Sequence, residues 1–272
     1  MAESSQSPGD PLSRAIALAR DALAVAPAGL LTDFDGTISP IVTDPALARV
    51  VGGGRDALAA LAERLDVVAV ITGRAPLDAR KLTGVPGILI AGNHGMEWLE
   101  PGASEPMSAP DAARISERLD EVLGRLPELP GVVPEHKGIS ASVHYRTAPD
   151  PEAARSAIVQ ALGDVEGRGL RLNHGRMIVE VRPVGLGDKG SAARAIVERF
   201  GLRGVVVMGD DATDLDMFRA VDALRATGRL RAAIIGVGGS AGEVLPALVE
   251  GCDVVLADPS EVAELLVALE RN

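Results

Sequence analysis

Apolar residues along this chain follow two patterns that alternate with each other. Short continuous runs, such as VVAVI at residues 67–71 and VVVMG at 205–209, are typical of strands buried on both faces. Longer segments, such as RDALAALAERL at 55–65, place their apolar residues on one side of a helix. Further runs end at Asp33 or cover 87–92, 232–238 and 253–257, and further helical segments cover 12–25, 76–82, 189–200, 213–225, 241–250 and 260–270. This alternation predicts an α/β fold with a doubly wound parallel sheet.

The pattern changes between residues 110 and 182, where polar and apolar positions alternate. The segments ISASVHYR (139–146) and MIVEVRP (177–183) suit an antiparallel sheet with one open face. In chain order, the expected elements are a helix at 111–126, strands at 131–136 and 139–146, a helix at 151–162, and strands at 169–173 and 176–182. We therefore expect an α+β domain inserted into the parallel-sheet core.

Clusters of proline and glycine mark the points where the insertion joins the core. They lie at 100–106 (EPGASEP) and 182–187 (RPVGLG). The expected division is a core of residues 11–105 and 186–272, an inserted domain of residues 106–185, and a disordered N-terminus of residues 1–10.

Composition narrows the classes of function. The formal net charge of -11 and an aromatic content of 2% argue against a general nucleic-acid surface and against base-stacking platforms. The net charge also argues against binding to an anionic membrane, and no apolar stretch approaches the roughly 18 residues of a membrane span. A single cysteine, Cys252, rules out an intramolecular disulfide and fits a reducing compartment. We therefore expect a soluble cytoplasmic protein.

Polar motifs follow several apolar runs, at the strand ends where open α/β sheets hold their active sites. Asp33 and Asp35 lie in LLTDFDGTISP, and such close like charges require a cation, a proton or hydrogen bonds. Thr72 lies in ITGR, where Gly73 lets backbone N–H groups approach an anion. Lys189 lies near the start of a predicted helix, where the helix dipole opposes a cation unless that cation binds an anion. Singly, these motifs also fit a turn-capping aspartate, an ordinary turn and a surface lysine.

A fourth motif, VMGDDATDLDMF at 207–218, follows another apolar run. It contains the aspartates Asp210, Asp211, Asp214 and Asp216. Such a concentration of carboxylates suits a hard divalent cation, and Mg²⁺ usually takes one or two of them together with a phosphate. Capping of the following helix explains Asp210 or Asp211 singly, but it does not explain the cluster.

The order DxDGT, TGR, lysine and GDDxTD resembles the haloacid dehalogenase superfamily of phosphatases. The resemblance implies that Asp33 is the nucleophile that attacks phosphorus and that Asp35 is the general acid and base. It implies that Thr72 and Lys189 bind the transferring phosphoryl group. It also implies a Mg²⁺ site formed by Asp33, Asp210 and the backbone carbonyl of Asp35. The candidate metal ligands are Asp33, Asp35, Asp210, Asp211 and Asp214.

The insertion lies between the second and third motifs, and its element order resembles the C2B cap of that superfamily. EHKGISASVHYR (135–146), EVRP (180–183) and GNHG (92–95) resemble the trehalose-6-phosphate phosphatase family. The candidate substrate-binding residues are Asn93, His94, Glu135, Lys137, His144, Arg146, Glu180 and Arg182. Mixed donors and acceptors suit sugar hydroxyls, and closure of a cap would exclude water from a reactive intermediate. A solvated sheet face, and a structural turn at 92–95, remain the alternatives.

The resemblance implies an enzyme of trehalose biosynthesis, a Mg²⁺-dependent hydrolase that converts trehalose 6-phosphate to trehalose and phosphate through a phosphoaspartyl intermediate. Its expected partner is a small sugar phosphate rather than a nucleic acid or a membrane. A functional pairing with a trehalose-6-phosphate synthase is a further expectation of the family. The alternatives are a phosphatase of the same superfamily acting on another glycosyl phosphate (sucrose 6-phosphate or a glycosyl-3-phosphoglycerate) and a non-catalytic sugar-phosphate sensor.

Overall fold

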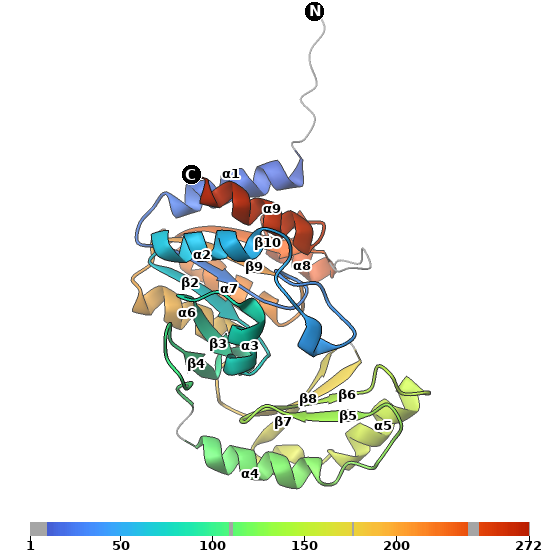
Figure 1. Ribbon diagram of the computed structural model, residues 1–272. Coiled ribbons are helices and arrows are strands. Elements are labelled where there is room, and N and C mark those ends of the chain that lie inside the picture. Colours follow the sequence, from blue (N-terminus) through green and yellow to red (C-terminus); the bar gives the residue numbers. More distant parts are fainter. Residues whose placement is uncertain (1–9, 109–110, 176, 239–244, 272) are drawn as a thin grey trace, which may run out of the picture. The chain divides into compact units, whose positions relative to one another are not determined.

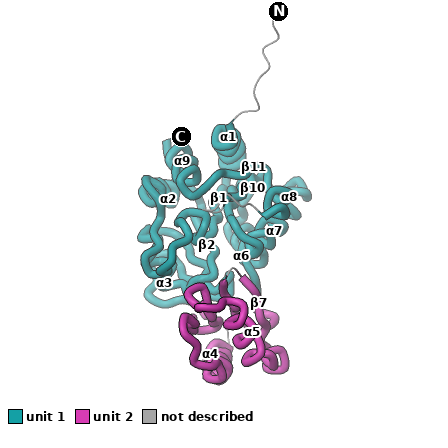
Figure 2. Tube along the Cα trace, turned by 90° about the vertical axis from the view of Figure 1, so that its right-hand side faces the viewer, with its two compact units in different colours: residues 1–107, 187–272 teal, residues 108–186 magenta. Residues whose placement is uncertain are grey.

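The chain folds into two compact units. The computed structural model describes residues 10–108, 111–175, 177–238 and 245–271 (Figure 1). Unit 1 is formed by residues 1–107 and 187–272, and unit 2 by residues 108–186 (Figure 2). The segment 1–9, which is expected to be disordered, lies outside the described residues.

Unit 1 is built on a seven-stranded sheet in the order β11-β10-β9-β1-β2-β3-β4. Its strands are β1 (Ala28–Thr32), β2 (Val67–Ile71), β3 (Leu89–Gly92), β4 (Glu97–Leu99), β9 (Gly204–Gly209), β10 (Arg231–Val237) and β11 (Val254–Leu256). All neighbouring strands pair in parallel except β3 and β4, which are antiparallel. The predicted doubly wound α/β core is therefore confirmed, whereas β4 was not predicted.

Helices cover both faces of this sheet because its strands are apolar on both sides. The helices of unit 1 are α1 (Pro11–Leu23), α2 (Gly54–Arg64), α3 (Pro76–Thr83), α6 (Lys189–Arg199), α7 (Asp214–Ala226), α8 (Pro246–Gly251) and α9 (Pro259–Glu270). Leu30 packs in the cluster that contains α1, α2, α3 and α9, whereas Leu31 packs with α6, α7 and α8. The predicted helix at 241–250 corresponds to α8, and residues 241–244 lie outside the described part of the chain.

The strand order reverses direction at β1. From β1 the chain proceeds to β2 and β3 on one side, and it later returns to β9 and β10 on the other side. In open α/β sheets, the carboxyl end of the sheet at such a switch point is where ligands bind. Asp33 follows β1 directly at this point, and its backbone N–H donates to the carbonyl of Met208 in β9 (3.0 Å).

Unit 2 has the predicted α-β-β-α-β-β order. Its elements are α4 (Ala112–Leu123), β5 (Val133–His136), β6 (Ala141–His144), α5 (Pro151–Ala161), β7 (Leu170–Gly175) and β8 (Ile178–Pro183). The strands form an antiparallel sheet in the order β5-β6-β8-β7. The register pairs Glu135 with Ser142 and Ser142 with Glu180, so these three residues share one face. Val143, which follows Ser142 in β6, points to the other face and is buried.

The three short 3₁₀ helices of the described chain are η1 (Pro45–Leu47), η2 (Asn93–Gly95) and η3 (Val165–Arg168). No helix in the described ranges combines the length and the apolar character that crossing a membrane requires.

Candidate active site

Asp33 lies at the carboxyl end of the central strand β1 and is almost fully buried. Its Oδ1 lies 2.9 Å from Nζ of Lys189. Burial raises the pKa of Asp33 to about 7; Lys189 lowers it, whereas the charges of Asp210 and Asp211 add to the rise. The ammonium group of Lys189 alone therefore does not compensate the charge of the Asp33 carboxylate, and a further cation would stabilise its ionised form.

Lys189 is the first residue of α6 and is also buried. Its Nζ donates to Oδ1 of Asp214 at 2.7 Å, in addition to its contact with Asp33. Burial lowers the pKa of Lys189, but the charges of Asp214 and Asp33 outweigh burial and hold this pKa well above its usual value. The lysine was expected to bind an anion, and in this structure it is paired with carboxylates of the chain itself.

Asp214 is the first residue of α7 and holds this arrangement together. Its second carboxylate oxygen, Oδ2, accepts hydrogen bonds from the backbone N–H groups of Asp210 (2.9 Å) and Asp211 (3.0 Å). Each oxygen of Asp214 therefore already has a donor, and the carboxylate joins the loop after β9 to Lys189.

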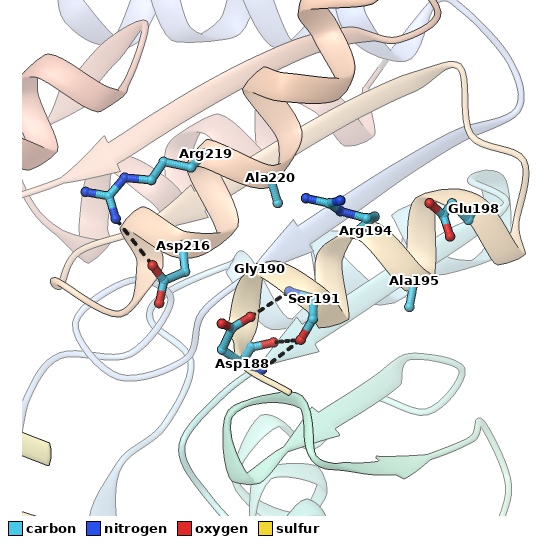
Figure 3. Close-up of a pocket in the computed structure, with 9 residues that line it drawn as sticks. All are labelled: Asp188, Gly190, Ser191, Arg194, Ala195, Glu198, Asp216, Arg219 and Ala220. Carbon is cyan, nitrogen blue, oxygen red and sulfur yellow. Dashed lines mark hydrogen bonds and ion pairs between the residues drawn. The ribbon is translucent and has the colours of Figure 1, made fainter. Parts of the chain in front are cut away.

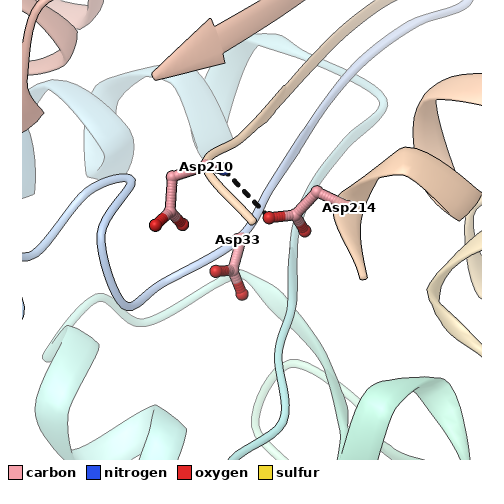
Figure 4. Close-up of side chains that lie close together, drawn as sticks. All are labelled: Asp33, Asp210 and Asp214. Atoms are coloured by element: carbon pink, nitrogen blue, oxygen red, sulfur yellow. Dashed lines mark hydrogen bonds between the residues drawn. The ribbon is translucent and has the colours of Figure 1, made fainter. Parts of the chain in front are cut away.

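Three carboxylates converge at this end of the sheet. One oxygen each from Asp33, Asp210 and Asp214 lies within 4.8 Å of the other two, and Figure 4 shows the side chains approaching from the loops after β1 and β9 and from the start of α7. Burial raises the pKa of Asp210 to about 8, and the charges of Asp214 and Asp211 act in the same direction. A group of acids that repel one another in this way is a favourable site for a cation.

The residues present fit a hard divalent cation. Carboxylate oxygens are the ligands that Mg²⁺ prefers. The loop after β1 also comes close to Asp210: Gly36 has a φ of +83°, and a Cβ atom added to it would lie 2.0 Å from Oδ2 of Asp210. The hydroxyl of Thr37 donates to the other oxygen of Asp210 at 3.2 Å. The backbone after β1 is therefore shaped to run against the Asp210 carboxylate, which only glycine at position 36 allows.

The other two predicted metal ligands have different partners. Asp211 caps α7: its Oδ1 accepts from the backbone N–H groups of Thr213 (2.7 Å) and Asp214 (3.1 Å). Asp35 forms a two-pronged ion pair with Arg74, with distances of 2.6 Å from Nε to Oδ2 and 2.7 Å from Nη2 to Oδ1. Arg74 was not among the predicted site residues, although it closes the TGR motif that contains Thr72.

Thr72 is buried directly after β2, in a loop fixed by β3 and the segment that follows it. The Thr72 N–H donates to Ala91 (2.9 Å), and its carbonyl accepts from the N–H of His94 (2.8 Å). Asn93 and His94 have φ angles of 48° and 60°, which side-chain-bearing residues rarely adopt.

Side chains reinforce this strained pair. Nδ2 of Asn93 donates to Oε2 of the buried Glu97 at 2.5 Å. The His94 ring lies against Gly73, where an added Cβ would come within 2.6 Å of the ring. These contacts support the structural-turn interpretation of GNHG, in which Asn93 and His94 shape the loop that carries Thr72.

Most of the remaining predicted substrate-binding residues gather on the polar face of the sheet in unit 2. Nε2 of His144 lies 2.8 Å from Oε2 of Glu135, and Nζ of Lys137 lies 3.7 Å from the same oxygen. Arg182 pairs with Glu180 through Nη2 and Oε2. The exposed Arg146 lies two residues beyond the end of β6.

A separate groove of about 480 Å³ lies in unit 1 between α6 and α7 (Figure 3). Its lining residues are Asp188, Gly190, Ser191, Arg194, Ala195, Glu198, Asp216, Arg219 and Ala220. The charged groups in it are partly paired, as with Asp216 and Arg219 (3.3 Å), and Asp188 caps α6 through the N–H of Ser191 (2.7 Å). None of the predicted catalytic or substrate-binding residues lines this groove.

Comparison with known families gives a match over most of the chain. The family model described as trehalose-phosphatase matches residues 31–236. The chain belongs to the trehalose-phosphatase family. All predicted catalytic, metal-binding and substrate-binding residues, from Asp33 to Asp214, fall inside the matched segment.

Two mycobacterial proteins share substantial sequence with the chain. A trehalose-phosphate phosphatase of Mycobacterium avium (strain 104) is 41% identical over 219 residues, which cover 77% of this chain and 55% of that protein. An uncharacterized glycosyl hydrolase of Mycobacterium tuberculosis (strain ATCC 25618 / H37Rv) is 41% identical over 207 residues, which cover 72% of this chain and 15% of that protein. The chain thus spans about half the length of the first relative and a small part of the second.

Solved structures of the trehalose-phosphatase family share the fold. The C-terminal domain of C. albicans trehalose-6-phosphate phosphatase superposes with a TM-score of 0.77 at 23% identity, covering 94% of this chain and 97% of that one. The similarity supports the predicted fold class, a doubly wound core with an inserted α+β domain.

Proposed function

We propose that this chain is a Mg²⁺-dependent phosphatase that hydrolyses trehalose 6-phosphate to trehalose and phosphate through a phosphoaspartyl intermediate. The observation that carries the proposal is the buried Asp33, held by Lys189 at the switch point of the sheet and surrounded by further carboxylates. Membership of the trehalose-phosphatase family supports the choice of substrate.

In the first step, a carboxylate oxygen of Asp33 attacks phosphorus, and the bond between phosphorus and the sugar oxygen breaks. Asp35 gives its proton to that oxygen, so trehalose leaves as an alcohol. Lys189 and the hydroxyl of Thr72 bind the phosphoryl oxygens. Lys189 is placed for this role because its Nζ already lies 2.9 Å from the attacking carboxylate.

In the second step, water attacks the phosphorus of the phosphorylated Asp33. Asp35, now ionised, takes a proton from this water while the bond between phosphorus and the Asp33 oxygen breaks. Inorganic phosphate leaves, Asp33 is again a carboxylate and Asp35 is again protonated. The two aspartates therefore have different tasks, in keeping with their different partners, Lys189 and Arg74.

Asp33 and Asp210 would hold the Mg²⁺ ion together with the backbone carbonyl of Asp35. The bound ion would neutralise part of the charge that otherwise separates a phosphate dianion from a carboxylate. We assign Asp214 to the positioning of Lys189, because both of its oxygens already accept hydrogen bonds. We assign Asp211 to the capping of α7.

The polar sheet face of unit 2 is proposed to bind the sugar. Glu135 lies beside Lys137 and His144, and Glu180 pairs with Arg182. The hydrogen-bonding atoms of these side chains can exchange partners with hydroxyl groups. Neutral sugar hydroxyls can both donate and accept, so they complement a face that carries both signs of charge.

The test is phosphate release from a panel of esters, measured with Mg²⁺ for the wild type, for Asp33→Asn and for the control Asp216→Asn. Asp216 lies in the same motif but pairs with Arg219 outside the cluster. We expect Asp33→Asn to abolish turnover with its circular dichroism unchanged, and Asp216→Asn to keep wild-type turnover. An unaffected rate in Asp33→Asn would refute the mechanism. Faster turnover of sucrose 6-phosphate or a glycosyl-3-phosphoglycerate would refute the substrate, and binding without turnover would indicate a sensor.

A further inference from the structure

The Asp35 carboxylate is held by an arginine from a different part of the sheet. Nε and Nη2 of Arg74, which follows β2, contact the two oxygens of Asp35, which follows β1, at 2.6 and 2.7 Å. Parallel paired bonds of this kind fix the plane of a carboxylate as well as its position. The Asp35 side chain is 37% exposed, whereas that of Arg74 is 15% exposed. The more exposed acid is therefore oriented by the more buried base.

Arg74 is itself fixed from several sides. Its Nη1 donates to the carbonyl of Pro45 at 3.0 Å, and its guanidinium group lies 5.3 Å from the centre of the Phe34 ring. Its backbone carbonyl accepts from the N–H of Asn93 at 2.8 Å. The strained turn at 93–94 therefore holds the backbone of Arg74, and the loop around η1 holds its guanidinium group.

We propose that Arg74 is a positioning residue that acts through Asp35. It holds the Asp35 carboxyl group in the orientation in which this group exchanges a proton with the sugar oxygen. The inference rests on the proposed function, in which Asp35 is the acid and base. An ionised carboxylate has about four acceptor positions, and Arg74 occupies one on each oxygen. The remaining positions are left for the proton that moves during the reaction.

A different role would be direct binding of the substrate's phosphate, because Arg74 follows the phosphate-binding Thr72 by only two residues. The two roles differ in their dependence on the leaving group. A sugar oxygen needs a proton to leave, whereas p-nitrophenol leaves as a stable anion. In the first step, loss of a residue that acts through the general acid therefore affects the sugar ester selectively. The second step does not discriminate, because both esters give the same phosphorylated Asp33. Loss of a phosphate ligand affects both esters.

The experiment isolates the first step by single turnover with enzyme in excess, and compares alcohol release from trehalose 6-phosphate and p-nitrophenyl phosphate in the wild type, Arg74→Gln and Arg74→Lys. For Arg74→Gln we expect the rate constant of trehalose release to fall about 100-fold, because misplacement of a reacting group has costs of this order. For p-nitrophenol release we expect a fall of less than about 3-fold, with the half-saturating enzyme concentration nearly unchanged for both esters. Arg74→Lys keeps the charge but loses the paired geometry, so we expect it to restore little of the rate. Equal losses on the two esters, or full rescue by lysine, would overturn the proposal.

A double-mutant comparison tests whether Arg74 acts through Asp35. In an Asp35→Asn background, Arg74→Gln is expected to lower the residual rate by less than about 2-fold, because the group that it positions is already lost. Additive losses would contradict the inference. The matched control is Arg225→Gln, which removes a comparable arginine–aspartate pair with Asp253 beside the start of β11. It is expected to leave the ratio of the two rates unchanged.

Failure of the inference about Arg74 can be distinguished from failure of the proposed function. If the wild type prefers another alkyl phosphate, the proposed substrate is wrong, and the same comparison with that ester still tests Arg74. If no ester is hydrolysed, the proposed function fails, and a crystal structure of Arg74→Gln tests the positioning directly. In that structure we expect the Asp35 carboxylate to leave its present place, and an unmoved carboxylate would overturn the inference.

Discussion

The charged residues of the two units are arranged in opposite ways. In unit 1, the buried carboxylates of Asp33 and Asp214 share the ammonium group of Lys189, and the carboxylate of Asp210 lies in the same cluster. On the sheet face of unit 2, acids and bases are matched, as with Glu180 and Arg182. An excess of buried negative charge favours binding of a cation, and the bound cation can in turn bind the anionic group of a ligand. A balanced set of donors and acceptors favours an uncharged, hydroxyl-rich ligand. One proposed substrate, a sugar phosphate, has both kinds of group.

Removal of Lys189 is expected to give the largest effect. Lys189→Met leaves two buried carboxylates without their cation, which costs about 3–5 kcal/mol of folding stability by analogy with other broken buried pairs. We expect turnover to fall at least about 1,000-fold, because the charge on the phosphoryl group also loses its partner. Urea denaturation and phosphate release would measure the two effects. Wild-type stability in this variant would mean that the two carboxylates do not need the charge of Lys189 to stay buried.

Glu180→Gln on the polar face of unit 2 is expected to have a smaller effect that depends on the substrate. It removes the charge opposite Arg182 while keeping the shape of the side chain. We expect KM for trehalose 6-phosphate to rise about 10-fold, which corresponds to one lost hydrogen bond to a charged group. Constants for p-nitrophenyl phosphate, which has no sugar, should change less than about 2-fold. A similar loss on both esters would place Glu180 in a structural role and weaken the contrast between the units.

A rise in melting temperature is expected when Mg²⁺ is added. A ligand at 100 times its dissociation constant stabilises the folded state by about 2.7 kcal/mol, which should raise Tm by several degrees for a chain of this size. Differential scanning fluorimetry with and without EDTA would measure the shift. Asp210→Asn should abolish it, whereas Glu180→Gln should leave it unchanged. A shift that survives Asp210→Asn would place the cation elsewhere.

Strand positions could be predicted because continuous apolar runs have few alternatives in a protein of this size. Asp33, Thr72 and Asp210 all follow such runs, so their meeting at one edge of the sheet followed from the parallel topology. The strand β4 was missed because three residues are too few to establish a period. Its neighbour η2 depends on backbone angles at Asn93 and His94 that no periodicity encodes.

The hydrogen-bond and ion-pair partners of each aspartate in the site could not be predicted from the spacing of residues in the sequence. Asp210 and Asp211 are adjacent and chemically identical, but one faces the cluster and the other caps α7. The difference arises from the turn into the helix. The pairing of Asp35 with Arg74 joins residues 39 positions apart, and it depends on how two loops meet in space. The TGR motif was recognised for its threonine and glycine. Its arginine could have been suspected only because the close charges of Asp33 and Asp35 were predicted to require a cation, a proton or hydrogen bonds.

The central place of β1 in its sheet has a consequence for how the protein is made. Leu30 and Leu31 leave the ribosome well before β9, which begins at Gly204 and is one of the two neighbours of β1. At about 5–20 residues per second, roughly 10 to 30 seconds of translation separate the two strands. Throughout that time the growing chain carries an apolar strand with an open edge, which is the kind of surface that associates with other chains. The strand that ends in Asp33 is thus among the first parts of the site to be synthesised and among the last to be enclosed.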